Sequence, residues 1–360
     1  MTRTITLSLD QLYRPQPGGI ATYVRGLATG LSELDDESLA VVGVAPRGSL
    51  PLGVAELPLR RATAPVGASL LTRLWPRWPI GVPGTSNVVH ATSMAGPFGG
   101  GTNGAVHSVA MHDLLWRDEP ASSTVQGIRF HERRLALIKA RDELRVIVTS
   151  PGLKARLVSE GIDAQRVHEA RLGVGDDATE AASHASVVGL LAEHGVRGPF
   201  TLYAGTREPR KNLDRLLDAH RAARSANPEL GNLVLAGPSG WGEVSTGDAT
   251  VVGLVSRSML KGLYRDATVF AYVPRAEGWG LPPVEALHEG SRVVASATTP
   301  SVVHNDEVVR VDPLDVASIA EGLVAALRLE HDERSTERRR ASVADLTWRN
   351  VALDHLAAWR

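Results

Sequence analysis

Short apolar runs alternate with stretches of helical periodicity along most of the chain. In the first half, two stretches at 20–34 and 122–143 have apolar residues at helical spacing, and a third, at 151–161, has the Ser-Pro start and Gly end of a short helix. The segments that predict strands there are TITLSLD (4–10), LAVVGVA (39–45), NVVHATS (87–93), SVAMHD (108–113) and RVIVTS (145–150).

A second series of the same kind begins near residue 199. Its predicted helices are 213–226, 256–267, the end of 277–290, and 315–329. Its predicted strands are FTLYAG (200–205), NLVLAG (232–237), ATVVGL (249–254), TVFAYVP (268–274), SRVVAS (291–296) and VVRVDP (308–313). Alternation of strands and helices indicates parallel sheets with crossover helices. The polar stretch GVGDDATEAASHAS (173–186) separates the two series. The pattern therefore predicts an α/β protein of two doubly wound domains, which suits 360 residues.

Composition narrows the class of function. The chain has 39 basic and 40 acidic residues and a formal net charge of -1, so a strongly basic nucleic-acid-binding protein is not expected. It has no cysteine, which excludes disulfides, thiolate zinc sites and cysteine nucleophiles. The N-terminus lacks the apolar core of a signal peptide, and no run of about 18 apolar residues occurs. We therefore expect a cytoplasmic protein.

Ligands of open parallel sheets bind at the carboxyl ends of the strands, so the chemistry is sought there. Gly18 and Gly19 follow the first strand and begin a helix, where a close backbone approach and an anion are both favoured. An ordinary turn would use the same residues. His112 ends another strand, beside Asp113, and such a pair is more often structural than catalytic.

Three cations crowd the turn between the strand ending at Gly205 and the following helix. They are Arg207, Arg210 and Lys211. A helix N-terminus disfavours cations unless something negative binds there. A phosphate fits, because Arg can clasp it with two hydrogen bonds and Lys acts as a point charge. A solvated basic turn offset by acidic neighbours is the alternative.

The stretch EGWGLPPVE (277–285) follows a predicted strand. Glu277 lies at the carboxyl end of that strand, and Glu285 lies in the first turn of the next helix. Carboxylates accept hydrogen bonds from sugar and ribose hydroxyls, and the amides of residues 278–281 can point to a ligand. Since Asp-x-Asp occurs nowhere in the chain, cations and helix dipoles would replace a metal in stabilising a leaving diphosphate.

These motifs together resemble the retaining glycosyltransferases of family 4. The resemblance rests on YAGTREPRKNLDRLLDAH, LVLAGPSGW, the stretch from VVGLVSRSML to GSRVVAS, and VDPLD, and it is strong over about 200–315. PGGIATYVRGLA, VVHATS, AMHD and VIVTSPGLKARL match more loosely. The resemblance implies the GT-B fold, in which two Rossmann-like domains face each other across a cleft and the C-terminal helix crosses back to the first domain.

The resemblance also implies domain limits and roles. The acceptor domain would be 1–175 plus the helix 345–360, and the donor domain 176–344. Glu285 would bind the ribose, and His112 would lie against the sugar as a catalytic residue with Glu277 and Lys211. The donor diphosphate would be bound by Gly18, Gly19, Lys211 and either Arg207 or Arg210. The transferred sugar would be contacted by Glu277, Gly278, Trp279, Gly280 and Leu281.

The implied reaction moves a hexose from a nucleotide sugar to a hydroxyl of a glycan, lipid-linked or small-molecule acceptor, with retention and without a metal or other cofactor. GDP-mannose is the first donor to test. A nucleotide-sugar 2-epimerase of the same architecture and a catalytically degenerate GT-B scaffold remain alternatives. Where many family members carry Pro-Glu, this chain has PSVVHND (300–306).

The segment 60–81 leaves a second question open. It interleaves Arg60, Arg61, Arg73 and Arg77 with Trp75 and Trp78. Such a mixture could contact the anionic inner surface of a membrane or a lipid-linked acceptor. A solvated loop over the core is the other interpretation.

Overall fold

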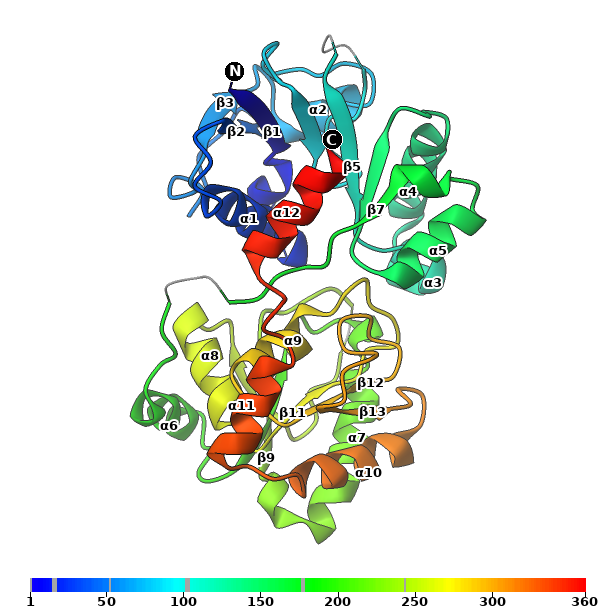
Figure 1. The fold of residues 1–360 in the computed structure, drawn as a ribbon. Helices are drawn as coiled ribbons and strands as arrows, with labels where there is room; N and C mark the ends of the chain where they lie inside the picture. The colour runs from blue at the N-terminus through cyan, green and yellow to red at the C-terminus, as the bar shows by residue number, and fades with distance from the viewer. Residues whose placement is uncertain (1, 15–17, 52, 101–103, 176–178, 243) are drawn as a thin grey trace. The chain divides into compact units, whose positions relative to one another are not determined.

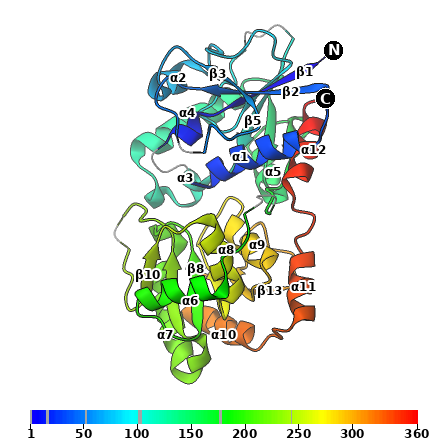
Figure 2. The same ribbon diagram turned by 90° about the vertical axis from the view of Figure 1, so that its left-hand side faces the viewer.

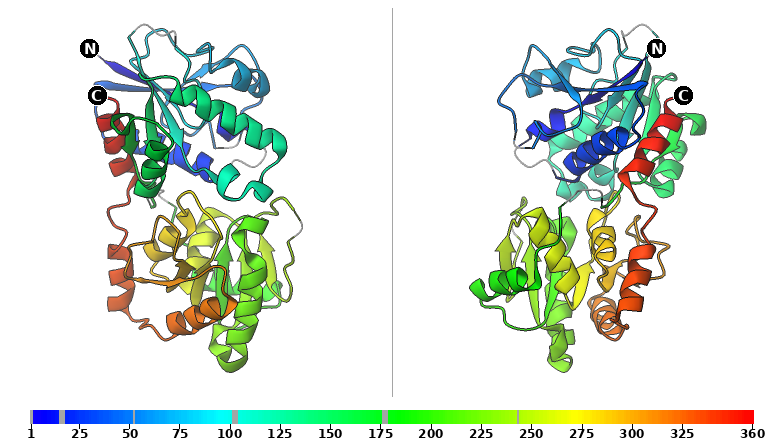
Figure 3. Two further views of the ribbon diagram at one scale, coloured as in Figure 1. Left: turned by 90° about the vertical axis from the view of Figure 1, so that its right-hand side faces the viewer. Right: turned by 60° about the vertical axis from the view of Figure 1, so that its left-hand side comes forward.

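The computed structural model describes residues 2–14, 18–51, 53–100, 104–175, 179–242 and 244–360. The chain divides into two compact units, Met1–Asp176 with Leu346–Arg360, and Asp177–Asp345. Each unit is a parallel β-sheet with helices on both of its faces (Figure 1, Figure 3). Within the described ranges, no helix has the length and the apolar composition that crossing a bilayer requires.

The first unit contains a sheet of seven strands in the order β3-β2-β1-β4-β5-β6-β7. All its strands are parallel, and the order reverses between β1 and β4. The strands are β1 (Arg3–Ser8), β2 (Leu39–Ala45), β3 (Arg60–Thr63), β4 (Val88–Ala91), β5 (Val106–Met111), β6 (Arg145–Val148) and β7 (Val167–Glu169). The helices are α1 (Gly18–Ser32), α2 (Ala68–Leu74), α3 (Leu115–Asp118), α4 (Val125–Lys139), α5 (Pro151–Ser159) and α12 (Trp348–Ala358), with 3-10 turns η1 (Asp10–Tyr13), η2 (Pro120–Ser122) and η3 (Ala164–Arg166).

The second unit contains a sheet of six parallel strands in the order β10-β9-β8-β11-β12-β13. The strands are β8 (Phe200–Ala204), β9 (Asn232–Ala236), β10 (Thr250–Gly253), β11 (Val269–Tyr272), β12 (Val293–Ser296) and β13 (Val308–Val311). The helices are α6 (His184–Glu193), α7 (Leu213–Ala226), α8 (Arg257–Asp266), α9 (Leu281–His288), α10 (Val316–Leu327) and α11 (Glu333–Ala341), with 3-10 turns η4 (Pro209–Lys211) and η5 (Pro228–Leu230).

Both sheets confirm the predicted doubly wound α/β class, but the polar stretch 173–186 is not all linker. Helix α6 begins inside it, because the Ser183 hydroxyl accepts a hydrogen bond from the Ser186 amide and caps the helix. Val187 and Leu191 are the buried side chains of this helix. The sequence prediction missed this helix, although Val187, Val188, Leu190 and Leu191 are apolar residues at helical spacing.

The C-terminal helix α12 packs along α1 (Figure 1, Figure 2). Two glycines of α1 permit this approach. A Cβ atom on Gly26 would lie 2.1 Å from the ring of Trp348, and one on Gly30 would lie 2.0 Å from the Trp348 carbonyl oxygen. The helix that follows the second unit in sequence therefore belongs to the first unit, as the GT-B resemblance implies.

A chain of buried hydrogen bonds joins α12 to α1 and the sheet. His355 Nδ1 lies 2.7 Å from a carbonyl of its own helix and must donate to it, so its Nε2 accepts from the Tyr23 hydroxyl at 2.7 Å. The Tyr23 oxygen then accepts from His90 Nε2, and His90 Nδ1 accepts from Ser108. The indole of Trp359 donates to Ser108 at 2.8 Å. Every donor in this chain has an acceptor, and both imidazoles are held neutral.

Substitution of Gly30 tests the close approach of the two helices. In Gly30→Ala the new methyl group would overlap a backbone atom of α12, which cannot rotate away, so we expect the free energy of unfolding of the first unit to fall by about 2 kcal/mol or more. Gly189→Ala in α6 is the matched control, since its added Cβ meets open space, and it should gain about 0.5 to 1 kcal/mol. Urea unfolding followed by tryptophan fluorescence measures both. Equal stability of Gly30→Ala and the wild type would contradict this packing.

The buried histidines predict a loss of stability in acid. Burial lowers the pKa of His355 to about 4, whereas the unfolded side chain titrates near 6.5. Between these values the unfolded chain binds a proton that the folded chain does not, so the free energy of unfolding falls as the pH drops below about 6.5, by up to about 1.4 kcal/mol per pH unit for this residue. His355→Gln should show a shallower dependence in urea titrations between pH 7 and 5. Equal slopes would show that His355 does not titrate as described.

Candidate active site

Lys211 is aimed at the sheet by an unusual backbone conformation. The residue after it, Asn212, has φ 63°, in the left-handed region, which Asn tolerates better than most residues. Its side-chain amide donates to the carbonyls of Val273 at 2.9 Å and Pro313 at 2.7 Å, at the carboxyl ends of β11 and β13. Asn212 therefore fixes the turn after β8 to the edge of the sheet, and Lys211 is buried there.

Lys211, Arg210 and Tyr272 converge on one oxygen of Glu277. The Oε2 atom lies 2.5 Å from Lys211 Nζ, 3.2 Å from Arg210 Nη1 and 2.5 Å from the Tyr272 hydroxyl. The other oxygen, Oε1, accepts one long bond of 3.3 Å from the Gly278 amide among the described residues. The carboxylate is therefore clamped through Oε2, while Oε1 keeps most of its capacity to accept hydrogen bonds.

The electrostatics of this cluster keep Glu277 ionised. Burial alone would raise the pKa of Glu277, but the positive charges of Lys211 and Arg210 outweigh it and lower the pKa to about 2. Burial pulls the pKa of Lys211 below its usual range, and Glu277 opposes that shift. Lys211 has three N–H donors, of which Glu277 and Tyr272 take two. The third has no partner among the residues described, so it can meet an anion.

Glu285 is also held by two donors. Its Oε1 accepts from Arg257 Nη1 at 2.7 Å, and its Oε2 accepts from the Tyr264 hydroxyl at 3.0 Å. Both donors come from α8, whereas Glu285 lies in α9. Each carboxylate oxygen keeps a second lone pair, so Glu285 can accept from a ligand hydroxyl in a fixed orientation.

The turn between the two glutamates requires glycine and rests on the loop after β12. Gly280 has φ +94°, and a Cβ there would lie 2.6 Å from Thr299 Cγ2. The Ser301 amide donates to the Trp279 carbonyl at 3.0 Å, and the Ser301 hydroxyl donates to the Gly280 carbonyl at 2.6 Å. The PSVVHND segment, which stands where many members of family 4 carry Pro-Glu, therefore holds this turn through Ser301.

The predicted sugar-contacting stretch is only partly open. Helix α9 begins at Leu281, and because two prolines follow it, the first turn offers fewer free amides than most helix N-termini. The Trp279 side chain is 6% exposed, and its Nε1 has no hydrogen-bond partner in the described part of the chain. The Trp279 side chain therefore packs in the core of the turn, and the Gly278 amide is the group of this stretch that donates to Glu277.

The structure separates the two arginines between which the sequence could not choose. Arg210 reaches Glu277 and Glu208, the latter through Nε at 3.0 Å. The guanidinium of Arg207 instead donates to the Gly237 carbonyl at 2.9 Å and to Ser239 Oγ at 2.6 Å, at the end of β9. Arg210 is thus the arginine that shares a carboxylate with Lys211.

The other predicted residues lie in the first unit. Gly18 begins α1 with φ +59°, and a Cβ on Gly18 or Gly19 would meet no atom within 4 Å. His112 follows β5, its Nε2 donates to the Thr92 carbonyl at 2.9 Å, and its ring lies edge-on to Tyr23 with centroids 4.9 Å apart. Burial lowers the pKa of His112, which favours a neutral imidazole.

Sequence reasoning missed the tyrosines of this site. Tyr272 and Tyr264 are fully buried and read as core residues of a strand and a helix. Arg257 was likewise interpreted as a helix residue without a role in the site. No local spacing links these residues to Glu277 or Glu285, and a hydroxyl in an otherwise apolar strand was the one available signal.

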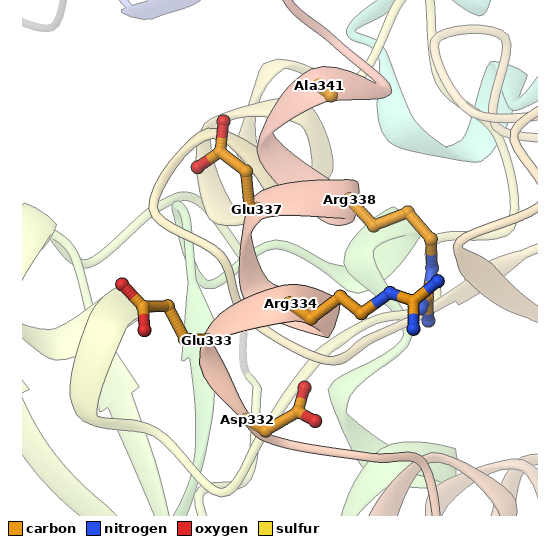
Figure 4. A pocket seen from close by; sticks show the side chains of 6 residues that line it. All are labelled: Asp332, Glu333, Arg334, Glu337, Arg338 and Ala341. Carbon is orange, nitrogen blue, oxygen red and sulfur yellow. The ribbon is translucent and has the colours of Figure 1, made fainter.

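Two further features carry no catalytic argument. Among the described residues, no group of three His, Asp or Glu side chains is arranged to hold a metal ion. A surface hollow of about 710 Å³ is lined by residues of α11 and its N-cap alone. Glu333 and Glu337 point to one side of the helix and Arg334 and Arg338 to the other, with Asp332 below Arg334 (Figure 4). A hollow that is lined by one helix alone is open surface and not a binding pocket.

Comparison with known proteins shows what this chain is similar to. Residues 198–328 match the family described as Glycosyl transferases group 1. O-antigen chain mannosyltransferase B of Escherichia coli is 32% identical over 174 residues, which is 45% of each chain. The serotype-specific mannosyltransferase WbdA of Escherichia coli is 26% identical over 245 residues, or 63% of this chain and 29% of WbdA. The chain thus spans less than half the length of these curated relatives.

Solved structures resemble the whole chain. Sucrose-phosphate synthase from Thermosynechococcus elongatus has a TM-score of 0.72 and 20% identity and covers 99% of this chain and 98% of its own. Anabaena HepE in complex with UDP-glucose has a TM-score of 0.71 and 14% identity, with 98% of each chain covered. The clamped carboxylate lies within the matched segment. The likeness to the solved structures shows the GT-B fold for this chain, and its residues 198–328 are similar to the glycosyl transferases group 1 family.

Proposed function

We propose that the chain is a retaining glycosyltransferase that moves a hexose from a nucleotide diphosphate sugar to an acceptor hydroxyl. The observation that carries this proposal is the clamped carboxylate of Glu277. A fixed oxygen acceptor lies beside Lys211 and Arg210, at the carboxyl end of β11, where the strand order of the sheet reverses next to β8. A sugar diphosphate is a ligand that needs a hydroxyl acceptor and cations side by side.

Each residue of the cluster has one task in this proposal. The open Oε1 atom of Glu277 accepts a hydroxyl of the sugar, and the remaining N–H of Lys211 donates to a phosphate oxygen. Negative charge grows on the diphosphate as the sugar leaves, so Lys211 and Arg210 stabilise the transition state more than the ground state. Glu285, oriented by Arg257 and Tyr264, accepts from the ribose.

The remaining parts of the proposal rest on the resemblance. Gly18 and Gly19 would approach the diphosphate from the first unit, and His112 would lie against the sugar. The acceptor is a glycan, a lipid-linked or a small-molecule hydroxyl, and cationic side chains take the place of a divalent metal. The mannosyl relatives favour GDP-mannose, whereas the UDP-glucose complex of HepE makes uridine donors the next to test.

A panel of nucleotide sugars tests the class of function first. GDP-, UDP-, dTDP- and ADP-sugars are compared by thermal shift, and one of them should stabilise the chain, by about 2.7 kcal/mol at a hundredfold excess over its dissociation constant. Stabilisation by none of them would contradict the transferase proposal. Formation of an epimerised nucleotide sugar without any acceptor would favour the epimerase.

The division of labour between Glu277 and Lys211 is tested by calorimetry with GDP-mannose and GDP, or with the pair that the panel selects. Glu277→Gln should weaken the nucleotide sugar about 10- to 100-fold, the value of a charged hydrogen bond, and leave the nucleotide nearly unchanged. Lys211→Met should weaken both ligands.

The matched control is Glu132→Gln, which removes one of the two carboxylate partners of Arg117 in the first unit. It should lower stability without affecting either ligand. Because Glu277→Gln leaves Lys211 partly uncompensated, its own loss of stability, about 3 kcal/mol, is measured alongside. Unchanged binding of both ligands in both site variants would refute the assigned site.

Tyr272 generates a separate prediction, as a positioning residue. In Tyr272→Phe the ring stays against Lys211, but the hydroxyl that holds Glu277 Oε2 is lost. We expect KM for the nucleotide sugar to rise and kcat to fall, each several-fold, with GDP affinity preserved. Tyr203→Phe is the control, because its hydroxyl donates to the Thr206 carbonyl instead. The role of Tyr272 would be wrong if both variants had the same kinetics.

A further inference from the structure

The first unit contains a long segment in which charge is strongly segregated. From Leu57 to His112 the sequence has no aspartate or glutamate, although the chain as a whole has a formal net charge of -1. The basic residues of this segment are Arg60, Arg61, Arg73 and Arg77. All four are exposed, and none is in an ion pair with any residue in the described ranges. They therefore present positive charge that no ion pair within the described ranges neutralises.

Helix α2 divides its apolar residues between two faces. Leu71 and Trp75 are fully buried against Val44 and Ala64, and the Trp75 indole donates to the Ile80 carbonyl at 2.9 Å. This inner face anchors α2 to the sheet. It accounts for one of the two tryptophans in the segment as an ordinary core residue.

The outer side of the same element is apolar as well. The Trp78 amide donates to the Leu74 carbonyl at 3.0 Å, so the helical path continues one turn beyond α2. Leu70, Leu74 and Trp78, at spacings of four, therefore share a side. Leu70 is 46% exposed and Trp78 is 54% exposed. Exposing these apolar side chains to water costs free energy, and a binding partner that covered them would remove this cost.

The arginines flank this apolar side. Arg73 and Arg77 immediately precede Leu74 and Trp78 along the helical path. Arg60 lies on β3, at one edge of the sheet, and shares a face of that strand with Ala62, which packs against the cluster that includes Leu71 and Trp75. Arg61 points to the opposite face. We refer to Arg60, Leu70, Arg73, Arg77 and Trp78 as the basic-aromatic surface.

We propose that the basic-aromatic surface docks on an anionic lipid bilayer. Tryptophan and leucine side chains are stabilised when they enter the membrane interface below the headgroups. There the N–H of an indole stays near water while its apolar ring contacts lipid. An arginine side chain holds its guanidinium at the level of the lipid phosphates while its aliphatic part covers apolar surface. A soluble anion would satisfy the arginines but would leave Leu70 and Trp78 in water, so the combination favours a membrane.

The strength of docking follows from the number of charges. Each Arg near an anionic surface strengthens binding about fivefold. Three arginines and a partly inserted tryptophan give reversible, salt-sensitive attachment, as for other proteins that lie on a membrane without spanning it. This proposal stands independently of the transferase proposal, since it concerns adsorption and not turnover.

Co-sedimentation of the full chain with vesicles tests the proposal. The wild type should pellet with phosphatidylcholine/phosphatidylglycerol vesicles, remain in solution with phosphatidylcholine alone, and be released by added sodium chloride. Arg73→Glu combined with Arg77→Glu should reduce the partition coefficient by about 25-fold or more, and Trp78→Ser by about tenfold. These side chains are exposed, so the variants should keep the wild-type circular dichroism and melting temperature.

Matched controls come from the second unit. Arg334→Glu with Arg340→Glu changes the net charge equally, on exposed residues of α11, and Trp241→Ser removes a tryptophan that is 44% exposed. Both controls should pellet like the wild type. Failure of the wild type to bind anionic vesicles, or equal losses in surface and control variants, would overturn the proposal. Release by soluble glycerol phosphate at constant ionic strength would also overturn it, because that result indicates a pocket for one phosphate.

Discussion

The buried ion pair between Glu277 and Lys211 is the interaction on which the second unit's site depends. A carboxylate this far from water is unfavourable unless charges and donors surround it, and here two cations and a tyrosine hydroxyl meet one of its oxygens. The pair joins the end of β8 to the end of β11, the strands between which the sheet order reverses. The same contacts that make burial tolerable also leave Oε1 with most of its capacity to accept hydrogen bonds.

Several backbone features exist to hold that pair in place. The left-handed Asn212 turns Lys211 inward and fastens it to carbonyls at the ends of two other strands. Gly280, which no other residue could replace without meeting Thr299, lets the chain pass from Glu277 into α9. Hydrogen bonds from Ser301 then fix the turn. The site is thus preorganised by rigid elements, which is what electrostatic stabilisation of a leaving group requires.

Sequence patterns predicted the parts of this protein that local physics determines. Helix α7 has its predicted limits because a clear apolar stripe runs from Leu213 to its end, and the central strands were found because they are continuous buried runs. The edge strands β3 and β7 were missed, since β3 is mostly exposed and reads as a polar loop. Helix α6 was missed because it follows directly on the polar stretch that was interpreted as a linker.

The candidate site shows the same division. Glu277, Glu285 and Lys211 could be selected because they lie at strand ends within recognisable motifs. Tyr272 could not, because its contact with Lys211 spans 61 residues and its position within β11 predicts only core packing. The choice between Arg207 and Arg210 also needed three dimensions, since it depends on whether the guanidinium turns toward β9 or toward Glu277.

A structure of the chain with a bound nucleotide sugar tests the central claim most directly. The account predicts a sugar hydroxyl within hydrogen-bond distance of Glu277 Oε1, with Oε2 still held by Tyr272, and a phosphate oxygen within reach of Lys211 Nζ. A sugar bound away from Glu277, or a carboxylate that contacts no ligand while the diphosphate lies elsewhere, would contradict it.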